Sequence, residues 1–109
     1  MSEVVVLGDV NVDIIVALTA PIERASDSPA HISFVGGGSA ANAACWLGHL
    51  GVNTTFIGSI GKDSNADFVL GEFARHGVAT NVHRGSLSTG TCIVLVEPGG
   101  ERTMLPDAG

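Results

Sequence analysis

Apolar residues along the chain follow patterns that predict a series of strands and two helices. Residues 4–8 form an uninterrupted, mostly β-branched run, which predicts a strand buried on both faces of a parallel sheet. Residues 54–59 and a shorter stretch near 81–83 also favour strands, and a helical stretch precedes each of them. Strands that alternate with helices in this way predict an α/β fold with a mostly parallel central sheet and right-handed crossovers.

The first helix is expected to run from Ser39 to about Leu50, beginning in a stretch of small helix-forming residues. Ser39 is its N-cap candidate, because a serine hydroxyl can accept a hydrogen bond from an early amide of the helix. Trp46, Leu47 and Leu50 are the candidates for core contacts. Gly51 is expected to end the helix in a left-handed conformation.

The second helix is expected to follow the turn at residues 61–64 and to run to about His76, with Gly77 ending it. His49 and His76 each lie within two residues of a helix-ending glycine, where a cation complements the negative end of the helix dipole. We therefore assign these two histidines a structural role and no role in catalysis.

Four further stretches predict strands outside this alternation. Residues 31–35 alternate between polar and apolar side chains, as a half-exposed strand does. Residues 91–97 and 102–105 flank a tight turn, which predicts a β-hairpin. Together with residues 13–18, these strands are expected to form a small sheet appended to the central one as a lid.

A run of glycines at residues 36–38 leads into the first helix and is followed by Asn42. Glycine lets the backbone approach a ligand closely, and the free amides at a helix start can bind a small polar or anionic group. Asn is a mediocre helix former, so Asn42 indicates a specific hydrogen bond; the alternative is a bond back to its own loop. The spacing of Gly36, Gly38 and Ala41 also fits a dinucleotide fingerprint, but the run does not follow the first strand and lacks the later acidic residue.

Asn11 and Asp13 alternate with valines directly after the first strand. In an extended backbone, alternate side chains lie on the same side. Open α/β sheets bind ligands beyond the carboxyl ends of their strands, so this pair is predicted to bind a ligand. The alternative is that the two residues form the polar edge of a solvated strand.

Composition and charge narrow the classes of function. The chain has 109 residues, a length that suits one domain or part of one. Of these residues, 45% are hydrophobic and 15% are charged, and the net charge is −6. Its five basic residues are not clustered, so a small molecule is expected as the ligand, with no nucleic acid and no membrane surface. No apolar run is long enough to cross a bilayer, and a cytoplasmic location is expected. Cys45 and Cys92 are expected to be buried free thiols, and the four histidines have no zinc-ligand spacing with them.

Four motifs, in order along nearly the whole chain, resemble those of the ribokinase or PfkB-type carbohydrate kinases. Residues 37–44, Gly-Gly-Ser-Ala-Ala-Asn-Ala-Ala, are similar to the N-terminal signature of that family, with Gly51 and Gly61 at its spacing. The other three motifs are residues 8–13 for the first-strand substrate motif, 61–63 for the G-x-D turn, and 88–91 with 100–103 for the lid hairpin. The resemblance implies a ribokinase-like fold, of which residues 1–109 would be the N-terminal part of one domain.

The resemblance also implies that the motif residues bind an acceptor sugar. They are Asn11, Asp13, Gly37, Gly38, Ser39 and Asn42. A carboxylate can accept hydrogen bonds from two hydroxyls, an amide both donates and accepts, and glycine lets the backbone approach the ring. Ser39 stands where ribokinases proper often have Lys, so the resemblance does not name the sugar. ATP and Mg²⁺ are the implied cofactors, with their main binding residues outside this chain.

The family's catalytic G-A-G-D motif, which supplies the base and the anion hole, lies in the C-terminal half of its members and has no counterpart in this sequence. We therefore expect the chain to be the acceptor-binding and lid portion of an ATP-dependent sugar kinase, inactive by itself and with an incomplete sheet. By the same resemblance, a homodimer through the lid strands is expected. The alternatives are a nucleoside kinase of the same fold and a non-catalytic module that uses the lid strands for pairing.

Overall fold

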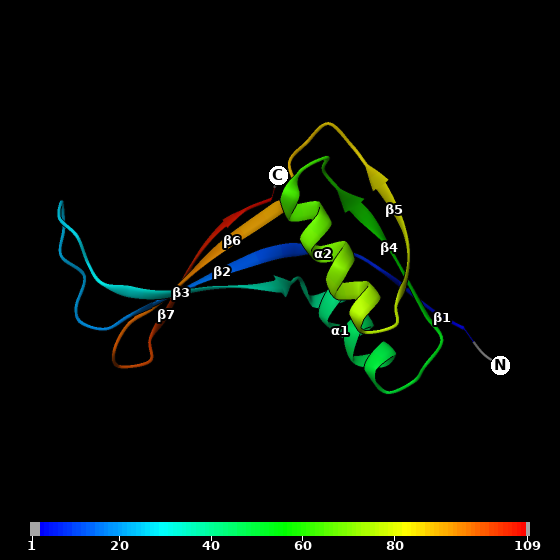
Figure 1. Ribbon diagram of the computed structural model, residues 1–109, viewed down its shortest axis with the longest axis horizontal. Coiled ribbons are helices and arrows are strands. Elements are labelled where there is room, and N and C mark those ends of the chain that lie inside the picture. The colour runs from blue at the N-terminus through cyan, green and yellow to red at the C-terminus, as the bar shows by residue number, and fades with distance from the viewer. Residues whose placement is uncertain (1–2, 109) are drawn as a thin grey trace.

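The computed structural model describes residues 3–108, which form two sheets and two helices (Figure 1). A parallel three-stranded sheet has the order β1-β4-β5, and a mixed four-stranded sheet has the order β3-β2-β6-β7. The strands are β1 (Val4–Leu7), β2 (Asn11–Leu18), β3 (Ala30–Gly37), β4 (Thr54–Ile60), β5 (Ala79–Arg84), β6 (Gly90–Val96) and β7 (Arg102–Asp107). The helices are α1 (Ser39–His49) and α2 (Ser64–Arg75).

The three-stranded sheet forms the α/β core, and both helices pack on the same face of it. Val6 of β1 lies beside Phe56 of β4, and both belong to the apolar cluster that includes residues of α1 and α2. On the opposite face, Val5 and Leu7 are 55% and 75% exposed. The prediction that the first strand is buried on both faces is therefore wrong within residues 3–108, because no described helix covers the second face.

The start of α1 depends on backbone conformation and not on a side-chain cap. Gly38 is the N-cap residue, its φ is 95°, and no side chain accepts a hydrogen bond there. Ser39 is instead the first helical residue, so its prediction as the N-cap is wrong. A left-handed Gly51, with φ of 83°, follows the other end of the helix as predicted.

Small residues form the face of α1 that packs on the core. Ala41 and Ala44 are buried, whereas Trp46 and Leu50 are largely exposed and Leu47 is half-buried. Each residue turns the helix by about 100°, so Trp46 lies about 200° around the helix from Ala44. The prediction that Trp46 and Leu50 face the core is wrong, because the alanines allow close approach and therefore set the buried face.

Helix α2 is capped by a carboxylate and contributes a phenylalanine ring to the core. Asp63 is its N-cap and accepts a hydrogen bond from the amide of Ala66 at 2.9 Å. The ring of Phe73 stacks on that of Phe56, with 4.6 Å between the ring centroids. Gly77, with φ of 72°, follows the helix as the sequence predicts.

The four-stranded sheet is built around β2, which is antiparallel to β3 and parallel to β6. β7 pairs with β6 in an antiparallel hairpin. These strands overlap the four stretches that the sequence sets apart from the central sheet, and they form one sheet. Figure 1 shows this sheet extending away from the helices, with its two hairpin ends far from the core. No helix in the described range 3–108 is long and apolar enough to cross a bilayer.

Candidate functional site

An open cleft of about 920 Å³ lies at the junction of the two sheets. Residues 8–10, which connect β1 to β2, and residues 85–88, which lie between β5 and β6, contribute to its lining. The ends of β4 and β7 also contribute. The cleft therefore lies at the carboxyl ends of the parallel strands, where open α/β sheets bind ligands.

A carboxylate and an amide from the start of β2 face each other in this cleft. The Asn11 amide nitrogen donates a hydrogen bond to Asp13 Oδ1 at 2.6 Å, and both residues are half-buried. Their side chains thus lie on the same side of the strand, as the alternation predicts. The hydrogen bond orients the Asp13 carboxylate while leaving part of both side chains open to the cleft.

Two glycines beside this pair have no room for a side chain. Gly37 lies opposite Asn11 in the β2–β3 register, and a Cβ on Gly37 would overlap the carboxylate of Asp13. Gly38 has a positive φ, and its Cβ would lie 2.5 Å from the carbonyl oxygen of Asp9. Close approach of the backbone at both positions therefore requires glycine.

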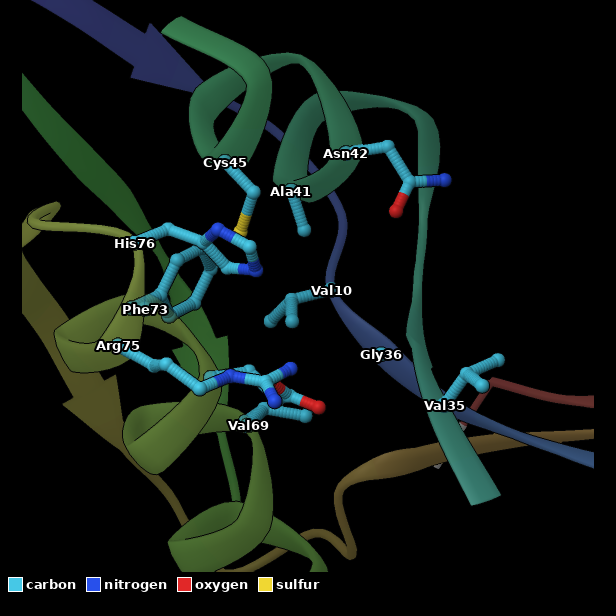
Figure 2. A pocket seen from close by; sticks show the side chains of 11 residues that line it. Val10, Val35, Gly36, Ala41, Asn42, Cys45, Val69, Phe73, Arg75 and His76 are labelled. Atoms are coloured by element: carbon cyan, nitrogen blue, oxygen red, sulfur yellow. The ribbon is translucent and has the colours of Figure 1, made fainter. Parts of the chain in front are cut away.

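Ser39 and Asn42 lie on the first turn of α1, outside the lining of the cleft. Ser39 is exposed, and Asn42 lines a second cavity of about 230 Å³ between α1, α2 and β3. Figure 2 shows Asn42 and Cys45 extending from α1 around this cavity, with Phe73 on the α2 side. Within residues 3–108 the Asn42 side chain has no hydrogen-bond partner, so it does not bond back to its own loop. The structure thus brings Asn11, Asp13 and Gly37 together, whereas Asn42 lines the smaller cavity and not the cleft.

The two cysteines are less buried than the sequence predicts. Cys45 and Cys92 are free, as predicted, but each is only partly buried. Burial, with a smaller effect of the nearby Glu72 carboxylate, raises the pKa of the Cys45 thiol. Cys92 lines the large cleft. The prediction of burial is wrong because the faces that carry both cysteines are only partly covered within the described residues.

Several residues of the cleft were not found as site candidates from the sequence. They are Ser59, His83, Ser86, Ser88, Cys92, Met104 and Pro106. These residues come from β4, β5, β6, β7 and the loop before β6, and only tertiary pairing brings them together. The turn signals around residues 85–90 mark a loop but do not indicate what it faces.

The fold and the cleft define a class of α/β proteins in which a mixed sheet, appended to a parallel core, borders a polar site at the core's carboxyl edge. The profile of the pfkB family of carbohydrate kinases matches residues 1–109, and the chain belongs to this family. The recognition of the family from its motifs is therefore confirmed.

Three relatives illustrate the likeness. A ribokinase from Staphylococcus aureus (strain COL) is 32% identical over 108 residues, which cover 94% of this chain and 35% of that protein. The structure of ribokinase from Giardia lamblia has a TM-score of 0.88 and 21% identity, covering 98% of this chain and 36% of its own. A fructokinase from Xylella fastidiosa, described with bound ATP, has a TM-score of 0.77 and 26% identity, covering 95% of this chain and 32% of its own. The predicted ribokinase-like fold is confirmed, and the chain spans about a third of the length of these relatives.

The contact between Gly37 and Asp13 leads to a prediction for a pair of neighbouring glycines. Gly37→Ala should displace the Asp13 carboxylate and lower the free energy of unfolding by about 1–3 kcal/mol, because overpacking forces neighbouring groups to move. Gly36→Ala is the matched control, since its Cβ would lie 3.8 Å from Glu72 Cγ, an ordinary contact. Urea unfolding measures both losses, and equal losses in the two variants would contradict the prediction.

Proposed function

We propose that this chain is the acceptor-binding and lid portion of an ATP-dependent sugar kinase, which transfers the γ-phosphoryl group to a sugar hydroxyl. The observation that carries the proposal is the hydrogen-bonded pair of Asn11 and Asp13, held against Gly37 in the cleft between the two sheets. Membership of the pfkB family supports the class of reaction. The carboxylate and the amide of the pair can both hydrogen-bond to hydroxyl groups, which supports a polyhydroxylated acceptor.

The chemistry of the pair suits a sugar. A carboxylate with two oxygens can accept hydrogen bonds from two neighbouring hydroxyls. Asn11 donates one hydrogen bond to Asp13, which fixes the direction of the carboxylate before any ligand arrives. A preoriented acceptor loses less side-chain entropy on binding than a mobile one. We assign Asp13 the main recognition of the acceptor hydroxyls and Asn11 a second contact.

The residues around the first turn of α1 complete the proposed acceptor site. Gly37 and Gly38 carry no side chain that would keep the backbone away from a sugar ring, and the place of a Cβ is filled at Gly37 by Asp13 and at Gly38 by the backbone of Asp9. Ser39 and Asn42 supply a hydroxyl and an amide beside them. The Asn42 side chain has no partner among residues 3–108, so it can turn to a ligand without breaking a hydrogen bond. We therefore keep both residues in the proposed site.

We assign the four-stranded sheet the role of a lid over the acceptor. Its strands β2, β6 and β7 form one wall of the cleft, and the core strands β1 and β4 form another. A cover of this kind excludes water from the reacting hydroxyl and strengthens the electrostatic interactions around it. The lid would thus protect the phosphoryl group from hydrolysis.

The cleft residues do not fit the triphosphate of ATP. Asp9, Asp13 and Asp107 contribute three carboxyl groups to its lining, and no Lys or Arg belongs to the lining within residues 3–108. A nucleoside triphosphate carries several negative charges, which such a lining repels. We propose that ATP and Mg²⁺ take part through groups outside the described residues, and we assign no residue of this chain to them.

One prediction of the proposed function concerns acceptor binding. Asp13→Ala should weaken sugar affinity about 10- to 100-fold, because it removes a charged acceptor of hydroxyl hydrogen bonds. Asp27→Ala, in an exposed loop, is the matched control and should leave the affinity unchanged. Titration calorimetry with pentoses, hexoses and nucleosides measures the effect and separates the sugar from the nucleoside alternative. Unchanged affinity in Asp13→Ala would refute the assignment.

Another prediction of the proposed function concerns turnover. We propose that the 109 residues alone do not transfer phosphoryl groups, because the transition state needs charge stabilisation that the acceptor residues do not supply. Loss of even one such donor lowers the rate by about 10²–10³. The assay supplies the purified chain with ATP, Mg²⁺ and a sugar panel and follows sugar phosphate. Many turnovers would contradict the proposal and require a base within these residues, with Asp9, Asp63 and Asp107 as candidates; of these, Asp9 and Asp107 line the cleft.

We propose in addition that two copies of the chain associate through their lids. A continuous apolar row crosses the sheet, since Ile14 is in register with Phe34 and Ile93, and Ile93 with Leu105. Phe34, Ile93 and Leu105 are 55%, 39% and 52% exposed. A row that is apolar from edge to edge suits a second copy of the same face, because a two-fold contact is self-complementary. The non-catalytic alternative predicts this association without any response to sugar.

Sedimentation of two matched variants tests the association. Phe34→Ser should weaken dimerisation at least about tenfold, because it removes an exposed aromatic side chain from the end of the row on the edge strand β3. Ile22→Ser, which changes a 53% exposed residue in the loop between β2 and β3, should have no effect. A chain that remains monomeric at high micromolar concentration would overturn the proposal.

A further inference from the structure

The loop between β5 and β6 is fastened to the turn that precedes α2. Thr89, the last residue of this loop, is only 2% exposed. Its hydroxyl donates a hydrogen bond to Asp63 Oδ1 at 2.7 Å and accepts one from the amide of Gly61 at 3.0 Å. Its own amide donates to Asp63 Oδ2 at 2.9 Å. Two residues 26 positions apart are thus joined by polar contacts that are partly buried.

Asp63 serves two elements at once. Its Oδ1 also accepts the hydrogen bond from the Ala66 amide that caps α2. The Thr89 hydroxyl, the Thr89 amide and the Ala66 amide together lower the pKa of the Asp63 carboxyl group below its usual range. A helix cap alone requires one oxygen, so the second oxygen of Asp63 is available for the contact with Thr89.

The backbone around these contacts leaves little freedom. A Cβ on Gly61 would lie 2.6 Å from the carbonyl oxygen of Leu87 and 2.8 Å from the nitrogen of Thr89, so the loop packs directly on this glycine. Arg84 Nε donates to the carbonyl oxygen of Gly61 at 3.2 Å, and the Gly85 amide donates to that of Ile60 at 2.9 Å. The loop is therefore held to the core along most of its length.

These contacts lie one residue from the four-stranded sheet. Thr89 is followed by Gly90, the first residue of β6, and Gly90 is in register with Asn11 of β2. A Cβ on Gly90 would lie 3.3 Å from Cβ of Asn11, so the two backbones are close. Residues 85–88 of the same loop line the cleft. A shift of Thr89 would therefore move a wall of the cleft relative to the Asn11–Asp13 pair.

We infer that Asp63 and Thr89 are a positioning pair, which holds the start of β6 against the core and thereby sets the geometry of the cleft around Asn11 and Asp13. The pair acts through the backbone and does not touch the acceptor. The link to acceptor binding rests on the proposed function, whereas the link to the position of β6 does not.

Three substitutions separate positioning from helix capping. Asp63→Asn keeps an oxygen for the Ala66 amide, because Asn caps helices about as well as Asp, but its NH₂ group would face the Thr89 amide. Thr89→Val keeps the shape of the side chain and removes the hydroxyl. Thr89→Ser keeps the hydroxyl and should restore the contacts. Asp27→Asn makes the same change of charge in the exposed loop between β2 and β3, away from these contacts, and is the matched control.

Amide hydrogen exchange and sugar titration are measured on the whole chain. In Asp63→Asn and in Thr89→Val, the amides of residues 91–93 should exchange about tenfold faster, while those of α2 keep their rates and sugar affinity falls. Thr89→Ser and Asp27→Asn should behave like the unmodified chain. Unchanged exchange at residues 91–93, or equal acceleration in α2 and β6, would overturn the inference. If the unmodified chain binds no sugar, the proposed function fails, and the exchange rates still decide whether the pair positions β6.

Discussion

The close approach of the Gly37 backbone to the Asp13 carboxylate is the constraint on which the candidate site depends. The two residues lie on neighbouring antiparallel strands, and a Cβ on Gly37 would overlap the carboxylate of Asp13. This approach keeps Asp13 beside Asn11 and holds the end of β3, directly before α1, against the start of β2. A larger residue at position 37 would separate β2 from β3 at the point where the lid meets the core.

The junction between the sheets is held by backbone contacts on one side and by side chains on the other. On the α1 side, Gly38 packs on the carbonyl oxygen of Asp9, which also accepts the amide of Ala41 at 3.2 Å. On the α2 side, the carboxylate of Asp63 joins the turn after β4 to the start of β6. Because both sets of contacts flank the cleft, a change in the orientation of the lid would also change the geometry of the cleft.

Apolar surface is distributed unevenly over the described residues. The helices bury one face of the three-stranded sheet, and the opposite face, with Val5 and Leu7, is open. In the apolar row across the lid, Phe34, Ile93 and Leu105 are exposed as well, and Trp46 projects from the outer side of α1. Exposed apolar groups of this extent favour association, and the lid row is the part whose register suits a second copy.

The sequence by itself determined the order of the elements, the glycine-ended helices, the hairpin and the alternation that puts Asn11 beside Asp13, because these depend on neighbours along the chain. Its motifs also identified the family and the ribokinase-like fold. Only the tertiary structure decided that Ala41 and Ala44 face the core in place of Trp46, that Asn42 borders a separate cavity, and that Thr89 binds Asp63. These outcomes depend on which surfaces meet and how closely backbones approach, and local periodicity carries no information about such long-range contacts.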